Sequence, residues 1–275
     1  MVNYVLLNTM TTFQTIFLGI IEGITEFLPI SSTGHLILAS KLLALDQTAF
    51  LKSFEIIIQL GAILAVIVLY YKDLFVMENI KKLVVGFIPT GIIGFLLYKI
   101  VKTYLFGNQN VVLWSLFLGG IILIIFELNN KRKVLLQNST IDANNTYNIS
   151  IISYKQSFII GLFQSLSIIP GVSRSAATII GGLSLGIDRE LIVKFSFLLA
   201  VPTMLVASGY DIIKNASAFS LDQFGTLTIG FVVSFVVAIL AIKFFLKYIS
   251  KHSFIGFGVY RIVLAIVVWV LVFGK

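Results

Sequence analysis

The chain contains no cysteine, so disulfide bonds, thiolate nucleophiles and cysteine-bound metals are all excluded. It also carries little charge: only 12% of its 275 residues are Asp, Glu, Lys or Arg, which is about half of what a soluble domain carries. So few charges cannot cover the surface of a soluble globule of this size. The deficit excludes an ordinary soluble enzyme, a disordered chain and a protein that reads nucleic acid.

The chain is rich instead in long apolar stretches. Hydrophobic residues make up 58% of it, and the apolar runs are continuous rather than alternating, which disfavours a membrane β-barrel. A helix of about 20 apolar residues crosses a bilayer. The stretches that approach this length are 54–71, 84–98, 111–127, 191–210, 225–246 and 254–273. The sequence therefore predicts an all-α polytopic membrane protein with one integral membrane domain over residues 1–275.

Two further apolar regions, 11–45 and 157–187, do not fit a single crossing. Each is too long for one span, and each carries a proline beside small polar residues near its middle, Pro29 in the first and Pro170 in the second. A proline removes an amide donor and clashes with the preceding turn, so a helix ends there. Broken helices at membrane depth occur only where protein or water lines them. We therefore predict two re-entrant helical hairpins, each of which enters and leaves on one side.

The two broken regions resemble each other and predict an internal repeat. Glu22 and Ser32 align with Gln164 and Ser173 when a one-residue gap is placed before the proline. Three spans follow each hairpin, so the second half must be upside down relative to the first, as in inverted repeats whose broken helices meet near the midplane. The predicted parts are two halves, 11–128 and 157–275, and a polar cytoplasmic linker, 128–156.

The distribution of basic residues orients the chain. If the N-terminus is outside, the inside loops hold eleven Lys and Arg residues and the outside holds six. Cytoplasmic loops carry the excess of basic residues, so we expect both termini on the extracytoplasmic side. The same rule accounts for the net charge of +8 without an acidic partner.

Ionisable residues inside the broken regions are the candidate functional residues: Glu22, Glu26 and His35 in the first, and Arg174 in the second. A charge in an apolar segment costs about 2.5–3.5 kcal/mol on insertion scales, so each needs a partner or a water-filled cavity. Glu22 and Glu26 are four residues apart and share one helix face. Hard oxygen ligands of this kind suit Mg²⁺ or Ca²⁺, whereas purely structural ion pairs are the alternative.

The first loop has features of an anion site. Ser31 or Ser32 can cap a new helix, whose first amides are then free donors. His35 lies three residues after Ser32, and a hydroxyl beside an imidazole is typical of an activated nucleophile. Capping alone, and a buried structural histidine, are the alternatives. The amides that would face an anion belong to Thr33, Gly34 and His35.

The second loop repeats this arrangement and adds a cation. Arg174 can bind a phosphate through two parallel hydrogen bonds. The other candidate ligands here are Gly171, Ser173, Ser175 and Thr178. A divalent cation, an arginine, hydroxyls, free amides and a histidine together suit a phosphate or diphosphate group. A substrate that meets them at membrane depth should carry a lipid tail.

Three polar residues outside the two loops receive separate predictions. Arg261, deep in the last span, needs an anion or carbonyl groups, and we expect a structural role. Glu55, at the start of the third helix, either reaches the site or makes a structural hydrogen bond. Glu127, at the end of a span, is expected to be solvated.

The stretches EGITEFLPISSTGH (22–35) and PGVSRSAAT (170–178) resemble the two signature motifs of the undecaprenyl-diphosphate phosphatases of the bacitracin-resistance type. FEIIIQLGAILAV (54–66) and the VYRI stretch around Arg261 are similar to that family as well. The resemblance covers essentially the whole chain. It implies an enzyme of the bacterial cell membrane that removes one phosphate from undecaprenyl diphosphate with a divalent cation, recycling the carrier lipid for peptidoglycan synthesis. It further implies that bacitracin competes for the substrate and that the active site opens to the outer side.

The resemblance also implies roles for individual residues. Ser32 would be the nucleophile and His35 its base. Glu22 and Glu26 would hold the metal or orient the diphosphate, and Arg174 would grip the phosphates. The residues that would assist Arg174 are Ser173, Ser175 and Thr178. Direct attack by water, and His35 acting as nucleophile or acid, stay open as alternatives.

Two other functions fit part of the pattern. A secondary transporter or lipid flippase also has inverted repeats with broken helices at the midplane, but it needs no Ser–His pair. A structural membrane scaffold leaves the buried Glu, His and Arg residues unexplained. The sequence leaves the oligomeric state open, with a homodimer as one option.

Overall fold

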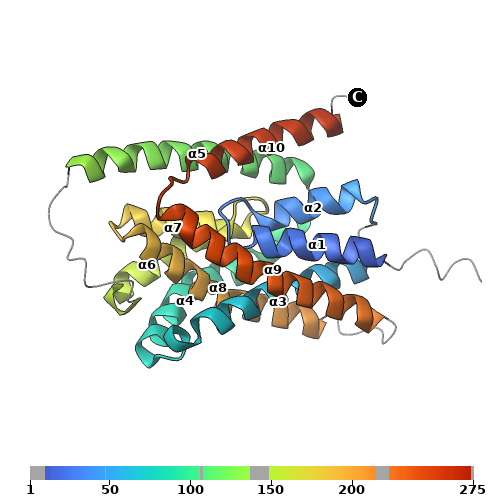
Figure 1. The fold of residues 1–275 in the computed structure, drawn as a ribbon, viewed down its shortest axis with the longest axis horizontal. Helices are drawn as coiled ribbons and strands as arrows, with labels where there is room; N and C mark the ends of the chain where they lie inside the picture. Colours follow the sequence, from blue (N-terminus) through green and yellow to red (C-terminus); the bar gives the residue numbers. More distant parts are fainter. Residues whose placement is uncertain (1–9, 47, 106–107, 137–148, 215–222, 274–275) are drawn as a thin grey trace, which may run out of the picture.

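The computed structural model describes residues 10–46, 48–105, 108–136, 149–214 and 223–273, and every regular element within these ranges is a helix (Figure 1). Short 3₁₀ or π turns at Val101–Leu105, Ile149–Ile151 and Leu166–Ile168 accompany the α-helices. The α-helices are α1 (Thr12–Thr25), α2 (Ser32–Leu42), α3 (Ala49–Leu74), α4 (Met77–Ile100), α5 (Gln109–Leu136), α6 (Tyr154–Ser165), α7 (Arg174–Ser184), α8 (Arg189–Lys214), α9 (Phe224–Ile249) and α10 (Ile255–Phe273).

The predicted spans correspond to α3, α4, α5, α8, α9 and α10. Five of them are long and apolar enough to cross a membrane, and α10 is apolar but shorter over Ile255–Leu271. Most of these helices extend beyond the predicted stretches because hydropathy marks only the part of a helix that suits lipid. The prediction of an all-α polytopic membrane protein is confirmed.

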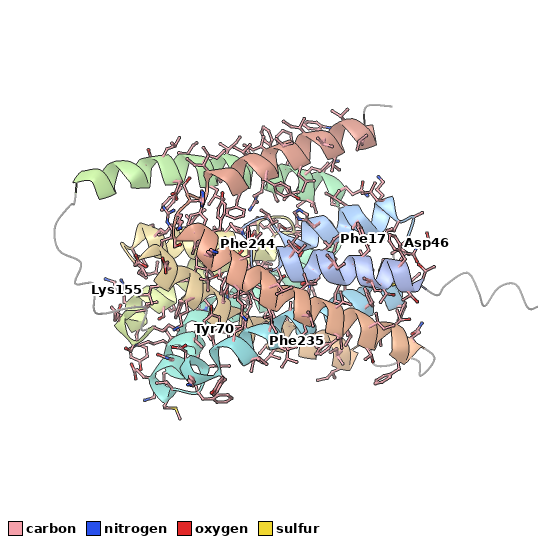
Figure 2. The ribbon with its side chains drawn as sticks, viewed as in Figure 1. Phe17, Asp46, Tyr70, Lys155, Phe235 and Phe244 are labelled. Carbon is pink, nitrogen blue, oxygen red and sulfur yellow. The ribbon has the colours of Figure 1, made fainter. Side chains whose placement is uncertain are left out.

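The outer surface of the bundle is apolar, as a lipid-facing surface must be. Phe244 is 64% exposed and Phe95 is 84% exposed, and exposed apolar side chains of this size are numerous along the helices (Figure 2). A soluble monomer rarely exposes contiguous apolar surface on this scale. Asp46 and Lys155 lie at opposite ends of the bundle (Figure 2).

Both broken regions form a helix, a turn and a second helix, as predicted. Each begins with the same device: Thr11 exchanges side-chain and backbone hydrogen bonds with Gln14, and Ser153 does so with Gln156. Such a capping box satisfies two free amides at a helix N-terminus. The two hairpins, α1–α2 and α6–α7, therefore start alike, although the capping residues differ.

The one-residue gap in the sequence alignment of the hairpins is wrong. Ser31 caps α2 with a φ of 71°, and Ser173 caps α7 with a φ of 75°. A positive φ is uncommon for serine, so this shared conformation identifies Ser31 as the counterpart of Ser173. The proline positions misled the alignment, because Pro29 and Pro170 occupy adjacent rather than equivalent places in the turn. Ser32 therefore corresponds to Arg174, not to Ser173.

The helices pack as two related sets. α1 packs on α9, where Gly19 meets the carbonyl of Gly230, and α6 packs on α4, where Gly161 meets the carbonyl of Gly86. Small residues let helices in a membrane approach closely. α5 and α10 pack together and run in opposite directions (Figure 1), as the last helices of two inverted halves must. The repeat boundaries stay a prediction.

Part of the predicted linker 128–156 is helical. α5 continues to Leu136, and α6 begins at Tyr154, so both ends of the 128–156 stretch are helical. The segment 137–148 lies outside the described residues. α5 ends at one end of the bundle, while α1 begins and α10 ends at the other end (Figure 1).

Arg261 holds the two broken loops together. It is fully buried, and its guanidinium donates to the carbonyl of Pro29 at 3.2 Å in the first loop. It also donates to Gly171 at 3.0 Å and Val172 at 3.1 Å in the second loop, and to Ser115 and Leu116 on α5. The predicted structural role of Arg261 is confirmed, with carbonyl dipoles rather than an anion as its partners.

Glu127 is not solvated, contrary to expectation. Its side chain is fully buried and forms an ion pair with Arg189, which also donates to the carbonyl of His252. Arg189 lies at the N-terminus of α8. The position of Glu127 in the sequence therefore does not reveal that the two residues pair.

The position of the Arg261 guanidinium predicts that a larger residue at Gly119 destabilises the protein. A Cβ at Gly119 would overlap the Arg261 guanidinium, whereas a Cβ at Gly209 in α8 meets no atom within 4 Å. We expect Gly119→Ala to lower the free energy of unfolding by about 1–3 kcal/mol through overpacking. Gly209→Ala, the matched control, should leave it unchanged or raise it, because alanine favours helix. Thermal unfolding in detergent followed by circular dichroism measures both, and equal midpoints would contradict the role of Arg261.

Candidate active site

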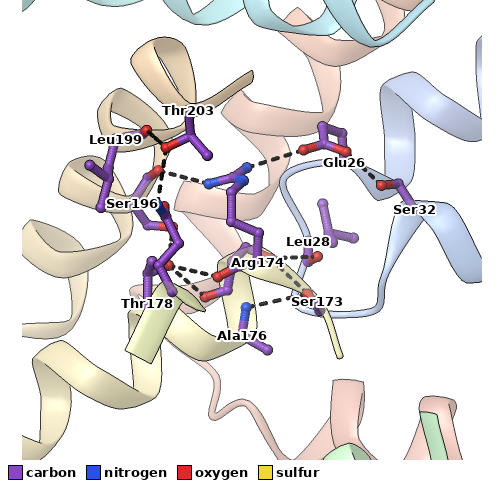
Figure 3. A network of polar contacts seen from close by, with 12 residues as sticks. Glu26, Leu28, Ser32, Ser173, Arg174, Ala176, Thr178, Ser196, Leu199 and Thr203 are labelled. Carbon is purple, nitrogen blue, oxygen red and sulfur yellow. Dashed lines mark hydrogen bonds and ion pairs between the residues drawn. The ribbon is translucent and has the colours of Figure 1, made fainter. Parts of the chain in front are cut away.

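Glu26 lies at the centre of the candidate site, between the two hairpins. It directly follows α1, and its Oε2 accepts a hydrogen bond from the Ser32 hydroxyl at 2.5 Å. Its Oε1 accepts a hydrogen bond from Arg174 Nη2 at 3.2 Å (Figure 3). Ser32 and Arg174 are the first residues of α2 and α7. Equivalent positions of the two repeats therefore converge on one buried carboxylate.

Arg174 keeps part of its guanidinium unused. Nη1 donates to the carbonyl of Ser196 at 2.9 Å, and the group lies 5.9 Å from the ring centroid of Phe27. Nε has no hydrogen-bond partner among the residues that the structure describes. A buried donor without a partner is costly, so this edge of the guanidinium is suited to an incoming oxygen ligand.

The hydroxyls of the second loop mainly hold the loop in place. The Ser175 hydroxyl donates to the carbonyl of Leu28 at 2.8 Å, and this hydrogen bond joins the two loops. The hydroxyl oxygens of Ser173 and Ser175 are 3.2 Å apart. Thr178 bonds the carbonyl of Arg174 and the hydroxyl of Ser196. Three predicted phosphate ligands are thus close to the site, but their hydroxyls already have protein partners.

Two of the three amides expected to face an anion are occupied. The amide of Gly34 donates to the Ser31 hydroxyl at 3.4 Å, and that of His35 donates to the Ser31 carbonyl at 3.3 Å. The amide of Thr33 has no such partner in the described part of the chain. Gly171, another predicted ligand, has a φ of 92°. Its carbonyl accepts a hydrogen bond from Arg261, so the contact that the structure shows for Gly171 is structural.

Glu22 is the most unusual group of the site. Its side chain is fully buried one turn before Glu26, and neither of its oxygens has a hydrogen-bond partner among the described residues. A buried carboxylate without a partner carries a large desolvation cost. No group of three or more His, Asp or Glu side chains that could hold a metal occurs in the described ranges. Glu22 with Glu26 nevertheless fits Mg²⁺, which is usually bound by one or two carboxylates together with water and substrate phosphate.

His35 does not pair with Ser32, contrary to the expected arrangement. Its Nδ1 lies 2.7 Å from the carbonyl of Ser31, and its Nε2 lies 2.7 Å from the hydroxyl of Tyr260. Both ring nitrogens are therefore engaged, and Glu26 takes the place beside the Ser32 hydroxyl. One helical turn brings the backbone of His35 close to Ser32, but the ring points toward α10.

Glu55 accepts a hydrogen bond from the Ser40 hydroxyl at 3.5 Å, which agrees with the structural alternative for this residue. The residues that sequence reasoning missed are Ser196, Phe27 and Tyr260. Phe27 and Tyr260 had a signal in the sequence, because they lie in the stretches 22–35 and VYRI that carry the family resemblance.

Comparison with known proteins matches this arrangement to a family. Residues 15–267 match the family described as "Bacitracin resistance protein BacA". The chain belongs to this family. A relative from Sulfurihydrogenibium sp. named "Undecaprenyl-diphosphatase" is 52% identical over 94% of this chain and 98% of its own. Relatives with the same name from Aquifex aeolicus and Wolinella succinogenes are 49% and 51% identical over 94% of this chain and 97% of theirs.

In this member of the BacA family the first helices of the two hairpins carry different polar residues at equivalent positions. Gln164 occupies in α6 the place that Glu22 occupies in α1. Its amide donates to Thr90 and Thr203, both at 3.0 Å. The Gln164 amide of the second repeat thus has hydrogen-bond partners within the protein, whereas the Glu22 carboxyl group of the first repeat has none among the described residues. The unpartnered carboxyl group of this pair therefore belongs to the first repeat.

The burial of Glu22 predicts an effect on stability. Glu22→Gln replaces the buried carboxyl group by an amide of nearly the same size, so it removes the candidate cation ligand without leaving a cavity. It should abolish the stabilisation by added Mg²⁺ or Ca²⁺ that cation binding at Glu22 and Glu26 would give the wild type. Glu190→Gln, at the N-terminal end of α8, is the control and should keep the response to cations. An unaltered response in Glu22→Gln would exclude Glu22 as a ligand.

Proposed function

We propose that this protein hydrolyses undecaprenyl diphosphate to undecaprenyl phosphate and inorganic phosphate within the bacterial cell membrane. The observation that carries the proposal is the Ser32–Glu26–Arg174 contact, in which a hydroxyl, a carboxylate and a guanidinium meet between two intramembrane hairpins. The family and the printed name of its relatives support this reaction and this substrate. The apolar outer surface supports a substrate that arrives through the lipid.

Ser32 is the proposed nucleophile, with Glu26 as its base. The Ser32 oxygen attacks the terminal phosphorus, Glu26 accepts the hydroxyl proton, and the bond from that phosphorus to the bridging oxygen breaks. Undecaprenyl phosphate leaves, and water then hydrolyses the phosphoserine. The 2.5 Å contact between Ser32 and Glu26 is within the reach that a general base needs. Attack by water, or by His35, is the competing pathway.

Arg174 is proposed to bind the terminal phosphate. Its free Nε and its Nη2, which must release Glu26, form the edge that matches two phosphate oxygens. A divalent cation held by Glu22 and Glu26 would neutralise charge on the diphosphate. The free amide of Thr33 would donate to the phosphate at the N-terminus of α2, and Gly34 lets the backbone approach it. The hydroxyls that would support Arg174 are those of Ser173, Ser175 and Thr178.

The proposed role in the cell follows from this chemistry. The product is the lipid carrier for wall polymers, so hydrolysis would recycle it for peptidoglycan synthesis. Bacitracin would compete with the enzyme for the same diphosphate lipid, which accounts for resistance when the enzyme is abundant. We further propose that both termini are extracytoplasmic and that the site opens toward the outer side.

A lipid flippase or transporter is the second candidate. The opposite directions of α5 and α10 and the meeting of two broken helices are typical of transporters built from inverted repeats. A transporter, however, has no need of a serine hydroxyl bonded to a carboxylate. Counterflow of a labelled lipid phosphate in proteoliposomes without hydrolysis would favour this function.

Substitutions at the centre of the site test the reaction. Ser32→Ala and Glu26→Gln should each lower kcat for phosphate release from undecaprenyl diphosphate by about 10²–10⁴-fold, the range for loss of a positioned acid, base or nucleophile. Ser250→Ala, at the end of α9, should retain full activity. Radiolabelled terminal phosphate should appear on the wild type and not on Ser32→Ala. Full turnover in Ser32→Ala would instead assign the attack to water or His35.

The orientation can be tested because the chain has no native cysteine. Lys41 at the end of α2 and Lys251 after α9 are both exposed. A membrane-impermeant maleimide should label Lys41→Cys in intact spheroplasts, and it should label Lys251→Cys only after permeabilisation. The reverse pattern would overturn the proposed orientation without affecting the proposed reaction.

A further inference from the structure

The contacts of His35 determine which of its nitrogens carries the proton. Nδ1 lies 2.7 Å from the Ser31 carbonyl, and a carbonyl can only accept, so Nδ1 is protonated. In the neutral ring Nε2 is then an acceptor, and it accepts the hydroxyl proton of Tyr260 at 2.7 Å. The two rings are parallel within 3°, with centroids 5.6 Å apart. The Ser31 carbonyl and the Tyr260 hydroxyl therefore select the tautomer and the orientation of the imidazole together.

The Ser31 carbonyl connects this pair to the proposed nucleophile. Ser31 has the unusual φ of 71°, and its carbonyl belongs to the peptide unit that also contains the amide of Ser32. A peptide unit is planar, so a ring that holds the carbonyl also fixes the direction of the Ser32 amide and the start of α2. The Ser32 hydroxyl extends from this backbone to Glu26.

α10 thus controls the site through two consecutive residues. Arg261 holds the carbonyls of both loops, and Tyr260 holds the ring that binds Ser31. We infer that Tyr260 is a positioning residue for phosphate transfer, which acts through His35 to keep Ser32 aligned for attack. The inference rests on the proposed function. It also explains why both nitrogens of His35 are engaged away from the Ser32 hydroxyl.

Tyr260→Phe is the direct test, because it keeps the stacked ring and removes only the hydroxyl. Without this donor the imidazole can move its proton to Nε2 and release the Ser31 carbonyl. We expect kcat for phosphate release from undecaprenyl diphosphate to fall about tenfold, since small misplacements of reacting groups are costly, while KM changes less than about twofold. Tyr248→Phe is the matched control, since Tyr248 stacks on the other histidine, His252, and it should leave kcat unchanged.

Nitrogen NMR of the histidine rings gives a second readout that a general loss of packing would not produce. The chain has only two histidines, so ¹⁵N-histidine labelling with a His252→Gln variant assigns the signals of His35. The wild type should show a protonated Nδ1 and an unprotonated Nε2. Tyr260→Phe should shift the population toward the Nε2-protonated tautomer, and Tyr248→Phe should not.

A double-mutant cycle tests whether Tyr260 acts through His35 or independently of it. In a His35→Gln background, Tyr260→Phe should cause no further loss of kcat, because contacts in one chain of interactions are not additive. Multiplicative losses, or a wild-type tautomer and kcat in Tyr260→Phe, would overturn the inference. Absence of phosphate release by the wild type would overturn the proposed function instead, and the ring spectra would still decide whether Tyr260 sets the tautomer of His35.

Discussion

The structure depends on one buried guanidinium. Arg261 donates hydrogen bonds to carbonyls of both interrupted loops and of α5. Carbonyl groups in a turn at membrane depth have no water to bond and would otherwise be unpaired. The arginine satisfies them and, by doing so, fixes the distance between the two loops. The breaks in α1–α2 and α6–α7 are tolerable because this cation lies between them.

The two loops, once joined, place different residues at equivalent positions. Ser31 and Ser173 cap α2 and α7 in the same unusual conformation, so the following residues, Ser32 and Arg174, both reach Glu26. One repeat supplies the hydroxyl and the carboxylates, and the other supplies the cation. Gln164 stands in the second repeat where Glu22 stands in the first, so the second repeat has no matching acid. Different residues at equivalent positions thus make an asymmetric site on a symmetric scaffold.

The architecture was largely predictable because its signals are local. Long apolar runs mark the spans, and a proline beside small polar residues marks each break, since both effects act over one or two helical turns. The alignment of the hairpins failed for the same reason: Pro29 and Pro170 look equivalent in sequence but differ by one place in the turn. The burial of Glu127 was missed because its partner, Arg189, lies on a helix far along the chain.

The sequence by itself determined that this is a helical membrane protein with acids, a histidine and an arginine in two broken segments, because hydropathy and the cost of intramembrane charge are properties of the residues alone. The tertiary structure decided the pairings: Ser32 with Glu26, His35 with Tyr260, and Arg261 with carbonyls of both loops. Hydrogen bonds depend on distance and direction to within a fraction of an ångström. Those quantities arise only when helices distant in sequence pack against one another.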